Sequence, residues 1–210
     1  MDIKSIYEAV VRGDRNAVEA GVKKVIEEGS APEVILNEGL IKAMDEVGRR
    51  FESGDFFVPE MLIAARAMKT GVAILTPLLV TSGVKAIGKV VIGTVAGDLH
   101  DIGKNLVGLM LEGAGFEVID VGTDVSIDRF VEAVRNEKPN LLGLSALLTT
   151  TMSGMIEVIK KLNEYNLREK LKIFIGGAPV TQTFAEQIGA DGYADDAASA
   201  SRKAKELMGL

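Results

Sequence analysis

The feature that most constrains this chain is the repeated alternation of strand-like and helix-like segments after residue 88. Four short runs rich in β-branched and other apolar residues are typical of buried strands: KVVIGTV, FEVIDVG, LLGLSAL and LKIFIGG. A shorter strand is expected at 192–194. Helical segments follow the five strands at about 101–114, 126–137, 152–165, 181–188 and 196–208. This alternation predicts an α/β domain, in which helices cover both faces of a five-stranded parallel sheet.

The first 80 residues carry a different pattern. Apolar residues recur at helical spacing, and glycine-containing breaks separate the apolar stretches. Four helices joined by short connections predict an N-terminal four-helix bundle. The predicted organisation is therefore a helical domain at 1–82, a linker at 83–89 and an α/β domain at 90–210.

Composition excludes several kinds of chemistry. The 210 residues include no cysteine and one histidine, so disulfides, thiolate metal sites, cysteine nucleophiles and multi-histidine metal cages are all excluded. A net charge of −6 disfavours a nucleic-acid partner. The longest mildly apolar run, VAILTPLLV at 72–80, is too short to span a bilayer. With no signal-like segment at the start, we expect a cytoplasmic protein without a membrane partner.

Polar and glycine residues gather after three of the predicted strands. The first strand is followed by AGDLHDIG, the third by SALLTTTM and the fourth by GGAPVT. In a flavodoxin-like (Rossmann-like) sheet of order 2-1-3-4-5, these strands are neighbours, and ligands bind outside their carboxyl ends. We therefore expect the three loops to form one site.

Each of these features also has an ordinary structural interpretation. A lone histidine in a loop is more often a surface residue or an already satisfied one than a ligand. Asp98, at a strand end, suits a phosphate-accepting receiver domain equally well. The glycine pair can form a simple tight turn. Methionines on apolar helix faces, Met61 among them, are core residues by default.

The chemistry around the histidine favours a binding site. A metal-ligating histidine commonly donates its second ring N–H to a carboxylate, and Asp98 lies two residues before His100. One imidazole cannot build a protein-only metal site. It suffices as a single axial ligand to a metal already held by a macrocycle.

The motif Asp98-x-His100-x-x-Gly103, followed by Ser145-x-Leu147 and Gly176-Gly177, resembles the DxHxxG…SxL…GG signature of cobalamin-binding domains. Residues 104–144 separate the first two pieces and residues 148–175 separate the last two, and both spacings match that family. The helical segment is similar to the cap domain that precedes the cobalamin domain in methionine synthase and in the small corrinoid proteins of methyltransferase systems. The resemblance covers essentially the whole chain.

The resemblance implies a cobalamin or related corrinoid cofactor, with a methylated form as the intermediate. His100 would be the lower cobalt ligand, Asp98 would accept a hydrogen bond from its other nitrogen, and Thr151 would stand where methionine synthase has a serine. These three residues would form a relay whose protonation is coupled to ligation. The other implied cofactor-binding residues are Asp101, Ile102, Gly103, Ser145, Leu147, Thr149, Gly176, Gly177 and Ala178, with Phe57 and Met61 over the methyl-bearing face.

The resemblance also implies a function. The protein would shuttle a methyl group from a substrate-specific methyltransferase to a second methyltransferase that acts on tetrahydrofolate or coenzyme M. A reductive activation protein is a further expected partner. The chain would be the methyl-carrying subunit, without catalysis of its own, and its cap would move on the linker during transfer.

Three alternatives stay open at this point. The chain suits the cobalamin subunit of an adenosylcobalamin mutase, although such subunits usually lack the cap. It also suits a cobalamin-dependent sensor or regulator, although no DNA-binding or signalling segment is recognisable. A receiver domain without corrinoid is the third alternative.

Overall fold

The computed structural model describes residues 2–82 and 86–210, which divide into two compact units. The first ends at Ala86 and also includes Gly113–Gly115, and the second comprises Ile87–Glu112 and Phe116–Leu210. The predicted linker at 83–89 falls partly on residues 83–85, outside the described residues, and its last residue, Lys89, begins the first strand. Each unit is considered by itself.

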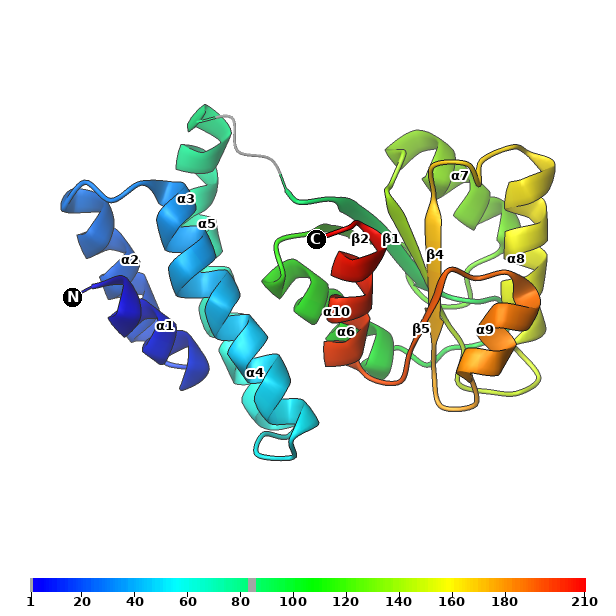
Figure 1. Cartoon of the computed structure of the whole chain (residues 1–210), viewed down its shortest axis with the longest axis horizontal. Helices are drawn as coiled ribbons and strands as arrows, with labels where there is room; N and C mark the ends of the chain where they lie inside the picture. Colours follow the sequence, from blue (N-terminus) through cyan, green and yellow to red (C-terminus); the bar gives the residue numbers. More distant parts are fainter. Residues whose placement is uncertain (1, 83–85) are drawn as a thin grey trace. The chain divides into compact units, whose positions relative to one another are not determined.

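The first unit is all helical (Figure 1). Its helices are α1 (Ile3–Val11), α2 (Arg15–Glu27), α3 (Pro32–Val34), the π-helical segment η1 (Ile35–Ile41), α4 (Lys42–Glu52) and α5 (Val58–Ser82). The segment 32–51, predicted as one helix, is continuous but widens into a π-helical stretch in its middle. The apolar stripes of the helices form the core, with Ile6, Val22, Leu40 and Met61 fully buried.

Helix α5 corrects one expectation. The sequence predicts no run able to span a bilayer, yet the stretch Val58–Leu79, with a mean hydropathy of 1.4, meets that test by length and composition alone. The difference arises because the run 72–80 is only the last part of a longer helix, which begins at Val58 and continues through Pro77. Its buried side chains, such as Met68 and Leu75, pack in the helical unit, where α5 lies against α2. The core helix of a folded domain passes the same test.

The second unit is the predicted α/β domain. Its strands are β1 (Lys89–Thr94), β2 (Glu117–Asp120), β3 (Leu141–Ser145), β4 (Lys172–Gly176) and β5 (Gly192–Ala194). All neighbouring strands are parallel, in the order β2-β1-β3-β4-β5. The predicted fold class is confirmed, including the strand order.

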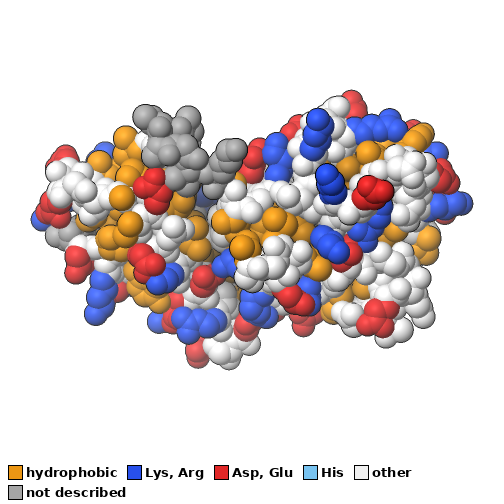
Figure 2. Space-filling view, turned by 45° about the horizontal axis from the view of Figure 1, so that its top comes forward, with side chains coloured by type: hydrophobic (Ala, Val, Ile, Leu, Met, Phe, Trp, Pro, Cys, Tyr) orange, Lys and Arg blue, Asp and Glu red, His pale blue; other side chains and the backbone are white. Residues whose placement is uncertain are grey.

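Five helices cover the two faces of this sheet (Figure 1): α6 (Ile102–Gly113), α7 (Ile127–Glu137), α8 (Ser153–Glu164), α9 (Gln182–Ile188) and α10 (Ala197–Leu207). Helices α7, α8 and α9 contribute Phe130, Met155 and Ala185 to one apolar core with the sheet. Helices α6 and α10 lie together on the other face, where the Ser201 hydroxyl donates to the Met110 carbonyl. On the side shown in Figure 2, acidic and basic side chains are interspersed over the visible surface.

Candidate corrinoid site

Strand register brings the three predicted loops together. Thr94, the last residue of β1, is paired with Ser145 at the end of β3, which is in turn paired with Gly176 at the end of β4. The loops that leave these three strands therefore start side by side at the carboxyl edge of the sheet. The predicted convergence follows from the strand order, because β1 and β3 meet where the direction of winding reverses.

Asp98 is the centre of this edge. Its side chain is completely buried. One carboxylate oxygen, Oδ1, accepts from the His100 backbone N–H at 3.1 Å and from the ring Nδ1 at 2.7 Å. The other, Oδ2, accepts from the backbone N–H groups of Leu147 at 2.7 Å and Leu148 at 3.3 Å and from the Thr151 hydroxyl at 2.7 Å. A single carboxylate thus ties the β1 loop to the β3 loop.

These contacts set the ionisation of Asp98. Burial alone raises the pKa of this carboxyl, but the hydrogen bonds from Leu147, Thr151 and His100 outweigh burial and hold the pKa well below its usual range. The buried group is therefore a carboxylate at neutral pH, and its charge is matched by donors rather than by a cation.

The His100 ring is held through one of its two nitrogens, Nδ1. Because the ionised Asp98 can only accept, the proton of the hydrogen bond between the two side chains lies on Nδ1. Half of the side chain is exposed, at 51%. On the backbone side, the fully buried Thr94 hydroxyl donates to the His100 carbonyl at 2.9 Å. The arrangement fixes one imidazole nitrogen on Asp98 and leaves about half of the side chain exposed.

Thr151 completes a hydrogen-bonded chain of three side chains. Its side chain is mostly buried, and its hydroxyl lies within reach of both Asp98 and the Leu148 carbonyl, at 2.7 and 2.9 Å. A hydroxyl has one proton, and the charged acceptor forms the stronger bond. The three residues named from the sequence as a relay are thus in direct contact in the order His100, Asp98, Thr151.

Apolar side chains are exposed on the same two loops. Leu99 and Ile102 flank the histidine segment with about three quarters of their surface accessible, and Leu147 and Leu148 of the β3 loop are about two fifths accessible. Four exposed aliphatic residues beside one oriented imidazole fit a flat, largely apolar macrocycle that supplies the remaining metal ligands. Among the described residues, no cluster of three or more histidine, cysteine or acidic side chains offers a protein-only metal site.

The glycines of the predicted site play different structural parts. A Cβ at Gly103 would meet open space, so the first turn of α6 leaves room above it. Gly177 has a φ of +128°, and a Cβ there would lie 1.9 Å from the Ala146 carbonyl oxygen. A Cβ at Gly176 would lie 2.8 Å from the Ala194 carbonyl oxygen. The glycine pair is thus explained by close packing of the protein's own backbone.

The remaining predicted site residues have fewer contacts, and they are described unit by unit. Asp101 is exposed and accepts from the Asn105 amide at 3.1 Å. Ser145 is half-buried, and Thr149 and Ala178 are exposed. In the helical unit, the two cap candidates differ, because Phe57 is 66% exposed whereas Met61 is fully buried. Only Phe57 offers surface to a ligand.

Sequence reasoning missed three residues around the loop that carries His100: Thr94 and Asp124, which contact that loop, and Lys104, which lies at its end. Thr94 lies within a strand run and looks like an ordinary β-former. Lys104 is almost completely buried and pairs with Asp120. Asp124 accepts from the Gly97 backbone N–H at 2.7 Å. Lys104 and Asp124 are ordinary charged residues in the sequence. Their partners, Asp120 and Gly97, lie in other parts of the chain, so the sequence does not show the contacts.

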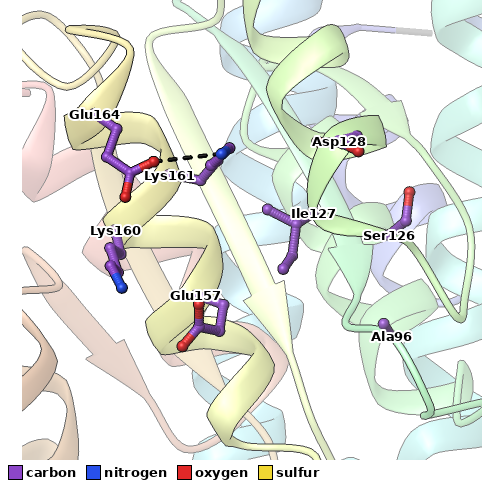
Figure 3. A pocket seen from close by; sticks show the side chains of 8 residues that line it. All are labelled: Ala96, Ser126, Ile127, Asp128, Glu157, Lys160, Lys161 and Glu164. Carbon is purple, nitrogen blue, oxygen red and sulfur yellow. Dashed lines mark ion pairs between the residues drawn. The ribbon is translucent and has the colours of Figure 1, made fainter.

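A separate groove of about 540 Å³ lies beside the first turn of α7 and along α8 (Figure 3). Charged side chains dominate its lining, and an ion pair joins Lys161 to Glu164 at 3.3 Å. None of the predicted site residues lines this groove, so it is not the site that the motif describes.

Comparison with known proteins agrees with the geometry. Two family models, both described as a B12 binding domain, match residues 88–202 and 2–76. Dimethylamine corrinoid protein 1 of Methanosarcina mazei is 45% identical over 207 residues, which cover 98% of this chain and 95% of the relative.

Solved structures are also similar. A cobalamin-binding protein from Desulfitobacterium hafniense superimposes with a TM-score of 0.82 at 32% identity, covering 98% of both chains. The methanol:cobalamin methyltransferase complex MtaBC from Methanosarcina barkeri contains a chain that superimposes with a TM-score of 0.86 at 34% identity, covering 99% of this chain and 79% of that one.

Proposed function

This chain belongs to the B12-binding corrinoid proteins of methyltransferase systems and is a homologue of the methylamine corrinoid proteins, and from that premise we propose that it holds its corrinoid through His100 and carries a methyl group between two methyltransferases. The observation that carries the proposal is the chain of hydrogen bonds from Thr151 through Asp98 to His100, which leaves one imidazole nitrogen free.

The residues present fit the cofactor in their chemistry, because one imidazole lies beside exposed aliphatic side chains. His100 Nε2 is the ligand atom, and the aliphatic side chains of Leu99, Ile102, Leu147 and Leu148 support the lower side of the macrocycle. Ser145, Thr149, Gly176, Gly177 and Ala178 line the slot for the displaced nucleotide tail.

When bound, cobalt supplies a nucleophile that accepts a methyl group and a leaving group that releases it. The chain's own residues set the tautomer and the orientation of the imidazole that would bind the cobalt. Asp98 stays ionised and holds the proton on Nδ1, so His100 offers Nε2 without a competing tautomer. When the imidazole is not ligated, the same hydrogen bond keeps Nδ1–H on the buried carboxylate. Thr151 keeps that carboxylate oriented throughout.

The similarities support a choice of partners. Resemblance to a chain of the MtaBC complex supports docking to a substrate-specific methyltransferase, and the 45% identity to a dimethylamine corrinoid protein favours a methylamine as the methyl donor. The second methyltransferase passes the methyl group to coenzyme M or tetrahydrofolate, and a reductive activation protein restores the cofactor after oxidation. These steps take place in the cytoplasm.

The single histidine makes a decisive experiment possible. Protein produced with ¹⁴N-histidine or with ¹⁵N-histidine is loaded with cobalamin, and electron paramagnetic resonance is recorded in the Co(II) state. If His100 is the ligand, the hyperfine pattern changes from the triplet of ¹⁴N to the doublet of ¹⁵N, because no other histidine exists. His100→Ala should lose the splitting while remaining folded. A pattern unaffected by the label would refute axial ligation by His100.

A further inference from the structure

The histidine lies in a segment, residues 97–104, that is fastened at both ends to the same neighbouring stretch of the chain. Only the second fastening reaches the strand itself, β2, at its last residue Asp120, whereas the first is made by the loop that follows β2. We call the whole stretch Asp120–Asp124 the β2 bracket. The bracket contains two of the charged residues that sequence reasoning left without a role. Its contacts with the histidine segment all lie within the α/β unit.

Asp124 fastens the beginning of the segment by two hydrogen bonds. Its backbone N–H donates to the Asp98 carbonyl at 2.9 Å, and its carboxylate accepts from the Gly97 N–H at 2.7 Å. Asp124 itself has a φ of +51°, in the left-handed region. Aspartate tolerates that region better than most residues but is still strained there. A strained residue that makes two bonds to one loop points to a positioning role.

Lys104 fastens the end of the segment. Its side chain is only 4% exposed, and the ammonium group pairs with Asp120 and donates to the Asn105 side chain at 2.8 Å. The other oxygen of Asp120 accepts from the Gly122 N–H at 2.9 Å. The first turn of α6 is therefore connected through one buried ammonium group to the bracket that holds Gly97 and Asp98.

The supports on the two sides of β1 differ in what they hold. The β3 loop holds the Asp98 side chain, through Leu147, Leu148 and Thr151. The β2 bracket holds the backbone on either side of His100. An imidazole that is hydrogen-bonded to one carboxylate keeps its orientation only if the backbone that carries both groups is fixed.

We propose that Asp124 and the Lys104–Asp120 pair are positioning residues that fix the histidine segment, so that the Nδ1–H of His100 stays on Asp98 before any cofactor binds. The inference deepens the proposed function, since orientation of the imidazole matters only if Nε2 is a ligand. The β2 bracket is a second support for His100, besides the β3 loop, and its residues Asp120 and Asp124 lie outside the DxHxxG…SxL…GG signature.

The test uses the full-length apoprotein with ¹⁵N-histidine, so that one imidazole gives all the side-chain signals. Nuclear magnetic resonance then measures the tautomer and the exchange of the Nδ1–H proton with water. Asp124→Gly removes the carboxylate but accepts the positive φ, whereas Asp124→Asn retains an acceptor oxygen for Gly97. Lys104→Met keeps an unbranched side chain of similar length but removes the ammonium group. Asp128→Asn, in the first turn of α7, is the matched control for loss of an acidic charge.

We expect Asp124→Gly and Lys104→Met to accelerate this exchange about fivefold, the factor equivalent to the ~1 kcal/mol net contribution of one hydrogen bond, and to reduce the population of the Nδ1–H tautomer. Asp124→Asn and Asp128→Asn should remain within twofold of the wild type. If Asp124→Gly and Lys104→Met lower the melting temperature but leave exchange and tautomer unchanged, the bracket serves stability alone and the inference is wrong.

Failure of this inference is distinguishable from failure of the proposed function. The exchange measurement is made without cofactor, whereas axial ligation is decided by the isotope pattern of the loaded wild-type protein. An isotope pattern that shows ligation, together with unchanged exchange in the variants, overturns the bracket alone.

Discussion

The buried carboxylate of Asp98 predicts a large and pH-dependent loss of stability in Asp98→Asn. Asparagine keeps one acceptor oxygen, and its NH₂ group then faces either the His100 donors or the N–H groups of Leu147 and Leu148. At least one buried donor is left without an acceptor, which costs about 1–3 kcal/mol, and the remaining bonds lose their charge assistance. We therefore expect a loss of about 2–4 kcal/mol at pH 7, with a fall in Tm on the order of 10 °C.

The pH dependence follows from the direction of the pKa shift. The pKa of the Asp98 carboxyl in the folded state lies well below its unfolded value of about 3.9. Its ionisation therefore stabilises the wild type fully above that value, and the benefit is lost progressively as the pH falls below it. For a folded pKa far below 3, linkage gives a decrease of about 1.3 kcal/mol in this benefit between pH 7 and pH 3. The difference between wild type and Asp98→Asn should shrink by that amount.

The measurement is urea unfolding of the two apoproteins, followed by circular dichroism at several pH values between 3 and 7, with Asp128→Asn as the control for removal of an exposed acidic charge. Because other carboxyl groups titrate equally in all three proteins, only the differences between them matter. A difference that stays constant down to pH 3 would refute the conclusion that the buried carboxyl is ionised, and a loss below 1 kcal/mol at pH 7 would refute its central structural role.

Further substitutions test individual packing and hydrogen-bonding arguments by the same unfolding assay. Thr151→Val removes the hydroxyl at nearly constant volume and should cost about 1–3 kcal/mol, whereas Thr151→Ser, which keeps the hydroxyl, should cost less than about 1 kcal/mol; equal losses would contradict the hydrogen bond. Gly177→Ala forces a Cβ against a neighbouring carbonyl oxygen and should cost more than about 3 kcal/mol, whereas Gly189→Ala, at a φ of +75° in open space, should cost about 1–2 kcal/mol. Met61→Ala should destabilise the helical unit by about 2–5 kcal/mol, whereas Phe57→Ala should change stability by less than about 0.5 kcal/mol. Similar effects of these last two changes would mean that the burial of Met61 is misassigned.

The α/β unit could be predicted from sequence because each strand and helix is indicated by the residues of its own short segment. Runs such as KVVIGTV are rich in β-branched residues and therefore favour buried strands. Parallel strands joined by helices then restrict the order of the strands in the sheet. The relay of His100 and Asp98 was predictable for a similar reason, since two residues of separation let the side chains meet. Thr151 was not derivable from spacing alone, because its contact with Asp98 spans 53 residues, and it came from resemblance.

The supports of the histidine segment escaped prediction because sequence gives no distance between loops. Asp124 and Asp98 become neighbours only when β1 and β2 pair in register, an event that places the isolated bridge from Val95 to Val125 beside them. A single aspartate in a turn is ordinary, and its left-handed φ is invisible in the sequence. The same reasoning applies to Lys104, which reads as a solvent-exposed residue of an amphipathic helix yet is buried against Asp120. The motif names the residues that are proposed to meet the cofactor. The residues that hold those side chains in place are defined by the packing of neighbouring strands and become visible only in the folded chain.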